Sequence, residues 1–322
     1  MLKAVFFSGA LAAALCTAAP AAAEPGLRVR NAAVRLTVIA EDRADVQVQL
    51  THANSRLPVE IRRDGDDVIV EGHALASSCF SGGGRSGVRL GWLFPIAEAD
   101  LPRIIVHMPR DAVISAQRGA VFGEIGATRS LRMGVSSCGR LTLGDVDQRL
   151  AINVAGSMSI HGARAGRAEL NLAGSGDIAL TRLAGDLRAR LPGSGELVVD
   201  SVRAADVDVA GSGDVRIGAV QSGLAAAIAG SGDIGAASVD GPVDARIVGS
   251  GDIRLRQGDA SSFRARIVGS GDISYGGTVG NLDASISGSG DIRVRRVTGT
   301  VSRRVMGSGD IIIGEQASAA EP

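Results

Sequence analysis

The 322-residue sequence lacks most of the residue types on which catalytic and nucleotide-binding sites depend. Lys3 is the only lysine, and aromatic residues make up 2% of the chain. No lysine follows a glycine-rich turn and no βαβ pattern surrounds one, so neither a P-loop nor a dinucleotide-binding motif is present. The four histidines, His52, His73, His107 and His161, follow no metal-ligand spacing. We therefore expect no catalytic residues, no cofactor-binding residues and no enzymatic activity.

An excess of charge is also absent. Lysine plus arginine and aspartate plus glutamate both number 34, and after removal of residues 1–23 the counts are 33 and 34, a net charge of −1. This balance gives no global reason to expect nucleic acid or an anionic membrane as a partner.

The N-terminus has the pattern of a secretory signal peptide. Lys3 precedes an apolar run over residues 4–19, and Ala21, Ala22 and Ala23 supply a cleavage motif before Glu24. The run is shorter than the roughly 20 residues that span a bilayer. A lipoprotein anchored at Cys16 is the alternative, although Leu15 stands where a small residue is required. We expect cleavage after Ala23, and an exported protein of the periplasm or cell surface that is not an integral membrane protein.

Two cysteines remain after such cleavage, Cys79 and Cys138. In an oxidising compartment a disulfide is more common for such a pair than a metal site or a catalytic thiol. Spacing alone cannot establish the required geometry. We predict a disulfide between them.

A glycine-rich motif dominates the rest of the chain. GSGD, or GSGE once, begins at eight positions that are 18 to 20 residues apart: Gly174, Gly193, Gly211, Gly230, Gly249, Gly269, Gly288 and Gly307. The residue after each acid is aliphatic, as is the residue two further on in most copies, with mixed residues between them. This alternation indicates strands with one buried face.

The segment before each motif alternates in the same way, and a third, shorter apolar position follows midway, so that two firm strands and one weak strand are expected per repeat. Equivalent positions of successive repeats carry the same kind of apolar side chain, which we expect to point inward. This pattern predicts an all-β fold, a parallel β-helix with rungs of about 19 residues stacked ~4.8 Å apart. We expect an irregular β-rich part with a cap over residues 24–115, a regular β-helix over 116–313 and a disordered tail over 314–322. Residues 77–87 are expected to form a flexible loop. Arg303 replaces a small inward residue, which predicts that the helix ends or is distorted there.

The acids of the motif form a predicted carboxylate ladder. Its members are Asp177, Glu196, Asp214, Asp233, Asp252, Asp272, Asp291 and Asp310. The glycines permit positive φ at a corner, where serine and aspartate hydrogen-bond to the turn. Calcium binding is the alternative, but calcium-binding nonapeptide solenoids place two facing loops around each ion and this motif occurs once per rung. Stacked carboxylates repel, so backbone N–H groups, arginines or loosely held cations must offset their charge.

Arginines form a second surface pattern. They lie at positions expected to face water: Arg188, Arg190, Arg246, Arg264, Arg266, Arg293, Arg295, Arg296, Arg303 and Arg304. Their charge is partly balanced by Asp206, Asp208, Asp244 and Asp283. They are either solvated surface residues or a basic stripe for an acidic glycan or a lipid headgroup.

The tandem GSGDI motifs, each preceded by an alternating strand, resemble the head GIN domain family, whose members carry the name auto-transporter adhesin. The resemblance covers roughly residues 34–313. It implies a right-handed parallel β-helix in an exported or envelope protein, with no established activity.

Together these features predict a non-enzymatic β-helix module of the cell envelope with a structural, adhesin-like or ligand-binding role. The alternatives are a polysaccharide-active β-helix enzyme and a cation-binding scaffold with calcium as its ion. The expected partners are an envelope glycan, a lipid headgroup or another protein, and not nucleic acid.

Overall fold

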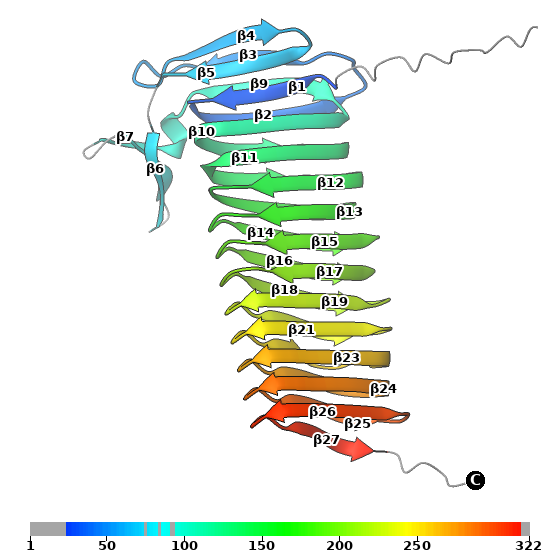
Figure 1. Cartoon of the computed structure of the whole chain (residues 1–322). Coiled ribbons are helices and arrows are strands. Elements are labelled where there is room, and N and C mark those ends of the chain that lie inside the picture. Colours follow the sequence, from blue (N-terminus) through cyan, green and yellow to red (C-terminus); the bar gives the residue numbers. More distant parts are fainter. Residues whose placement is uncertain (1–23, 74–75, 83–84, 91–93, 317–322) are drawn as a thin grey trace, which may run out of the picture.

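The protein folds as a parallel β-solenoid of about 11 turns, seen in the computed structural model (Figure 1). The structure describes residues 24–73, 76–82, 85–90 and 94–316, so the predicted signal peptide lies outside the described residues. Strands dominate this part of the chain, and its one helical segment is a short 3-10 turn, Glu98–Asp100. The predicted all-β solenoid with rungs of about 19 residues is confirmed.

Each regular rung contributes a strand to two long faces. One face contains β14 (Asp177–Leu183), β16 (Glu196–Val202), β18 (Asp214–Val220), β20 (Ile234–Val239), β22 (Ile253–Leu255), β25 (Ile292–Val297) and β27 (Ile311–Gln316). The other contains β12 (Val146–Val154), β15 (Asp186–Leu191), β17 (Ala204–Val209), β19 (Leu224–Gly230), β21 (Val243–Gly249), β23 (Asp259–Gly269) and β26 (Val301–Gly307). The longer strands β10 (Asp111–Ile125), β11 (Thr128–Leu143), β13 (Ser157–Leu172) and β24 (Ile273–Gly288) contribute to both faces.

Parallel pairing in register stacks the repeated sequence on itself. Ile253 pairs with Ile273, and Ile273 with Ile292, so that equal side chains lie above one another in the core. The third apolar position of the repeat is also buried, but it lies at the end of the same strands: Leu183, Val202, Val220, Val239 and Val297. The expectation of a separate weak strand is therefore wrong, because the first strand of the repeat bends and continues to this position.

The thin interior has room for few rings. Phe263 and Tyr275 pack against each other near the C-terminal end, with ring centroids 5.3 Å apart. The Tyr275 hydroxyl donates a hydrogen bond to the Val239 carbonyl oxygen at 2.9 Å. Burial, with the nearby Asp240 and Asp259, raises the pKa of Tyr275 to about 12. The tyrosine is thus held in its neutral form with its polar atom satisfied.

The N-terminal part forms further rungs out of chain order. β1 (Gly26–Arg30) and β2 (Ala33–Glu41) stack on β10, and β5 (Asp67–Gly72) and β9 (Arg103–Pro109) stack on β1 and β2. β3 (Gln47–His52) and β4 (Val59–Asp64) then pair antiparallel with β9 and β5. These two strands close this end of the solenoid, at the top of Figure 1.

Residues 77–87 do not form a loop throughout, so that expectation is wrong. β6 (Ala76–Gly82), β7 (Arg85–Leu90) and β8 (Phe94–Ala97) form a separate antiparallel sheet beside the solenoid. The sheet is stabilised by a second small core, in which Val88 and Ile96 pack with Leu57, Leu101 and Phe122.

A disulfide bond anchors this sheet. The Sγ atoms of Cys79 in β6 and Cys138 in β11 are 2.02 Å apart, and the Cα atoms are 5.9 Å apart, within the usual range for disulfides. Both cysteines pack against the second core. The bond therefore links the side sheet directly to the solenoid wall.

Candidate binding surfaces

The GSGD motif forms a corner at which the chain passes from one long face to the other. Its first glycine has positive φ in five successive rungs, 149° at Gly230, 136° at Gly249, 134° at Gly269, 142° at Gly288 and 135° at Gly307. The corners also stack closely, since a Cβ atom on Gly269 would lie 2.1 Å from the Gly249 carbonyl oxygen. Both conditions require glycine.

The aspartates of the corner connect successive rungs. In each case Oδ1 of one aspartate accepts a hydrogen bond from the backbone N–H of the ladder residue in the next rung. The five bonds between aspartates measure 2.8–3.2 Å: Asp214 to Asp233, Asp233 to Asp252, Asp252 to Asp272, Asp272 to Asp291 and Asp291 to Asp310. Asp177 accepts from Glu196 at 3.3 Å. The longer Glu196 does not continue the pattern, and the Asp214 N–H instead donates to the Gly195 carbonyl oxygen.

Arginines at every second rung bind the remaining carboxylate oxygens. Arg293 contacts Oδ2 of Asp272 at 3.1 Å and of Asp291 at 2.5 Å. Arg254 makes the same pair of contacts with Asp233 and Asp252. Arg216 contacts Glu196 and Asp214. Six of the eight ladder acids are thus ion-paired in twos, which offsets the repulsion between stacked carboxylates.

We expect calcium to leave the stability of the solenoid unchanged, because backbone N–H groups and arginines already occupy the ladder oxygens. Among the described residues, no group of three histidine, cysteine, aspartate or glutamate side chains is arranged to hold a metal ion. Thermal melting of residues 24–322 with excess calcium and with a chelator checks this. A midpoint several degrees higher in calcium would show instead that the ladder binds cations.

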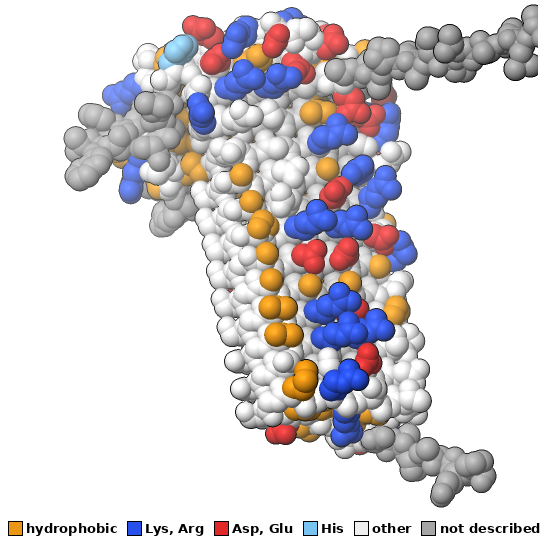
Figure 2. All heavy atoms as spheres, viewed as in Figure 1, with side chains coloured by type: hydrophobic (Ala, Val, Ile, Leu, Met, Phe, Trp, Pro, Cys, Tyr) orange, Lys and Arg blue, Asp and Glu red, His pale blue; other side chains and the backbone are white. Residues whose placement is uncertain are grey.

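The predicted basic stripe is divided between the two faces. Arg190, Arg246, Arg266 and Arg304 form one outward column on the face of β15 to β26, whereas Arg293, Arg295 and Arg296 lie in β25 on the other face. Many of these arginines are neutralised locally, as by the contact of Arg188 with Asp206 at 3.3 Å and of Arg246 with Asp244 at 2.8 Å. The surface in Figure 2 accordingly carries both charges in alternation.

An exposed apolar column borders these charges. It is formed by the residue before the first glycine of the motif: Ala173, Pro192, Ala210, Ala229, Val248, Val268 and Met306, with Ser287 as the exception. Figure 2 shows this column as an orange line beside the arginines. The face therefore combines a charged half with a narrow apolar edge.

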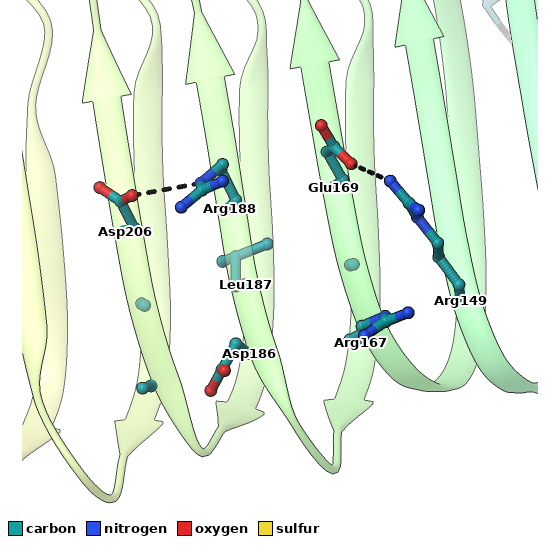
Figure 3. Close-up of a pocket in the computed structure, with 10 residues that line it drawn as sticks. Arg149, Arg167, Glu169, Asp186, Leu187, Arg188 and Asp206 are labelled. Carbon is teal, nitrogen blue, oxygen red and sulfur yellow. Dashed lines mark hydrogen bonds and ion pairs between the residues drawn. The ribbon is translucent and has the colours of Figure 1, made fainter. Parts of the chain in front are cut away.

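A groove runs along the charged half, across the rungs. Its first part, of about 500 Å³, has a floor of buried Ala168, Leu187 and Ala205 (Figure 3). A second part of about 610 Å³ shares Ala204 and Ala205 with the first and extends past Phe263 to Ser302 in β26. The groove is therefore an elongated depression parallel to the solenoid axis.

The walls of the first part consist of ion pairs and one additional cation. Arg149 binds Glu169 at 2.5 Å, and Arg188 binds Asp206. Asp186 is paired with Arg203, also at 2.5 Å. Arg167 makes no ion pair with any described residue, and Figure 3 shows its guanidinium beside the floor. It is thus the cation of this groove that is available for an acidic ligand.

A smaller hollow of about 400 Å³ lies on the other face beside the ladder. Arg216 and Arg254 flank it, and Gly235 between them leaves its floor without a side chain. The nearest atoms to a Cβ atom at Gly235 would be 3.9 Å away, so the fold does not require glycine there.

The histidines do not come together. His107 Nδ1 lies 2.6 Å from Glu41 Oε1, and His161 Nε2 lies 3.2 Å from Ser159 Oγ, far apart in the solenoid, while His52 and His73 are exposed elsewhere. The described residues also contain no helix long and apolar enough for a membrane crossing.

These features define a parallel β-solenoid with repeated glycine–aspartate corners and shallow, charged surface grooves. The chain belongs to the family described as "Putative auto-transporter adhesin, head GIN domain", whose model matches residues 134–238 and 235–320. The resemblance noted in the sequence is thereby confirmed.

Two solved structures match this chain over most of its length at low sequence identity. A putative lipid binding protein from Parabacteroides distasonis is 19% identical with a TM-score of 0.37, over 90% of this chain and 92% of that chain. A putative cell adhesion protein from Clostridium sporogenes is 11% identical with a TM-score of 0.17, over 91% and 93%. No curated protein matches this chain.

Proposed function

We propose that this protein is an exported, non-enzymatic binding module of the cell envelope, and that its axial groove binds an extended acidic glycan. The observation that carries the proposal is the groove itself, which crosses successive rungs and has Arg167 beside its floor. A polymer lying along the axis meets the side chains of one rung after another, ~4.8 Å apart.

The chemistry of the groove favours a glycan over an apolar ligand. Its floor residues are almost completely buried, so a ligand gains little apolar contact. Its walls present arginine and carboxylate groups, which donate to and accept from sugar hydroxyls, and arginine binds a carboxylate in bidentate geometry. Arg167 would then pair with an acidic sugar substituent.

The ion pairs in the groove support binding without catalysis. Glycoside cleavage needs two carboxyl groups that are free to act on the two sides of the glycosidic bond. Glu169, Asp186 and Asp206 are each held in an ion pair with an arginine. The polysaccharide-active alternative therefore lacks two unengaged carboxyl groups among these groove residues.

Export is supported by the leader-like pattern of residues 1–23 and by the disulfide, since such bonds persist in oxidising compartments. We propose the periplasm or the cell surface as the location.

The test is calorimetric titration of residues 24–322 with a polyuronate, with neutral dextran as the control polymer. Arg167→Ala is expected to weaken polyuronate binding at least about tenfold, the effect of losing one charge-assisted hydrogen bond. Arg129→Ala is the matched control, because Arg129 pairs with Asp111 outside the groove. Equal binding of dextran, equal effects of the two substitutions, or release of reducing ends would each overturn the proposal.

A further inference from the structure

The two ends of the solenoid differ in how they are closed. At the N-terminal end β3 and β4 add antiparallel strands beyond the outermost rung. At the other end β26 pairs only with β24 and β27 only with β25 among the described strands, so the last rung is itself the end of the sheet. Figure 1 shows β26 and β27 in this terminal position. Their outer backbone edges and their inward side chains are therefore uncovered by the described chain.

The last rung is apolar as well as uncovered. Val305, Met306 and Ile312 are 43%, 62% and 46% exposed, and they are three of the seven exposed large apolar side chains among the described residues. Met306 also ends the apolar column described above. Met306 lies outward on the face of β26 and Ile312 outward on the opposite face of β27, so the end of the solenoid is apolar on both sides. Exposed apolar side chains gathered at one end mark an interaction surface.

The same rung carries an excess of positive charge. Residues 292–316 contain five arginines against two acids, Asp310 and Glu315, a net charge of +3 in a chain that is neutral overall. Arg296 is paired with Glu315, and Arg293 with two ladder acids. Arg295 and Arg304 make no ion pair with any described residue. The overall balance of charge thus conceals a basic end.

We propose that this C-terminal end docks onto an anionic lipid surface. Arg295, Arg303 and Arg304 would contact the acidic headgroups, and Met306 and Ile312 would enter the boundary between headgroups and acyl chains. Apolar side chains placed among arginines are the combination that anchors proteins peripherally at such surfaces.

A second copy of the chain fits this end less well. End-to-end pairing would bring two clusters of +3 together, and like charges repel. Head-to-tail stacking would place the last rung against β3 and β4, whose antiparallel direction does not continue the parallel pairing of the rungs. A soluble polyanion would match the arginines but would gain nothing from Met306 and Ile312. The lipid surface is the partner that uses both sets of residues.

The experiment is co-flotation of residues 24–322 with vesicles of phosphatidylcholine mixed with phosphatidylglycerol, compared with pure phosphatidylcholine. We expect binding to the anionic vesicles alone. Joint replacement of Arg295, Arg303 and Arg304 by glutamine should lower the partition coefficient about a hundredfold, from about fivefold per arginine. Met306→Ser combined with Ile312→Ser should lower it at least about tenfold.

Two matched controls isolate the end of the solenoid. Replacing Arg56, Arg110 and Arg129 by glutamine removes the same charge from the N-terminal half, and Ile39→Ser with Ile61→Ser removes two other exposed apolar side chains. Both control proteins should bind as the parent does. Equal losses in the controls, equal binding to neutral vesicles, or an unchanged affinity after the Met306 and Ile312 substitutions would each overturn the proposal.

A gain-of-signal variant avoids any dependence on weakened folding. Met306→Trp should show a blue-shifted emission and quenching by brominated lipid only with anionic vesicles. Light scattering that reports a dimer, dissociated by the Met306 and Ile312 substitutions, would assign this end to self-association instead. Because Arg167 lies in β13, far along the axis, this result is independent of glycan binding in the groove.

Discussion

Alanine in place of Gly269 should prevent the C-terminal rungs from folding, or destabilise them by about 4 kcal/mol or more. The substitution forces a Cβ atom onto a residue with φ of 134° and places that atom 2.1 Å from the Gly249 carbonyl oxygen. The obstacle is backbone in the rung below, which cannot rotate away as a side chain could. Urea unfolding of residues 24–322, followed by circular dichroism, measures the loss.

Gly235→Ala is the matched control for this experiment. Gly235 lies in β20 with extended backbone, and no atom would approach an added Cβ atom within 3.9 Å. We expect a change within about 1 kcal/mol, with stabilisation favoured because alanine restricts the unfolded chain. If both variants lose similar stability, the close approach of corners is not what requires glycine at 269.

The second large effect is expected from removal of the disulfide. Replacing Cys79 and Cys138 by alanine releases a loop of 59 residues, which costs about 4 kcal/mol in the chain-entropy model. The loss should concentrate in the small core of Leu57, Val88 and Phe122, because the stacked rungs do not depend on the bond. Hydrogen exchange should therefore increase in β6 to β8 while the regular rungs stay protected.

Reductant provides the control for the cysteine prediction. The chain from residue 24 onward contains no other cysteine, so dithiothreitol should reproduce the double substitution in the parent and leave the variant unchanged. A parent protein whose unfolding midpoint is unaffected by reductant would contradict the prediction.

The repeat made the solenoid predictable, because its inward columns appear in the sequence with a period that the rungs then share. The side sheet was not predictable in the same way. Residues 77–87 contain glycines and serines that suggest a loop. Val88 is buried by Leu57, Leu101 and Phe122, which lie far apart in the sequence and share no sequence pattern.

The division of the arginines between two faces could have been predicted from the sequence. Arg293 to Arg296 follow a GSGD corner, whereas Arg303 and Arg304 precede the next one, and each corner moves the chain to the other face. The groove could not have been predicted from the sequence, because its position depends on which side chains are small at neighbouring rungs. Arg167 lies before the first clear motif, where the repeat is weak.

The arginine contacts make two rungs, rather than one, the electrostatic unit of this solenoid. Arg216, Arg254 and Arg293 are 38 and 39 residues apart, and each neutralises the acid of its own rung and that of the rung before it. A gene duplication of a single repeat that lacks such an arginine would preserve every buried column but leave one carboxylate without an arginine. Lengthening by pairs of repeats would keep both the buried columns and the pairing of each carboxylate with an arginine. A designer extending this solenoid, or selection acting on its length, should therefore favour adding an even number of repeats.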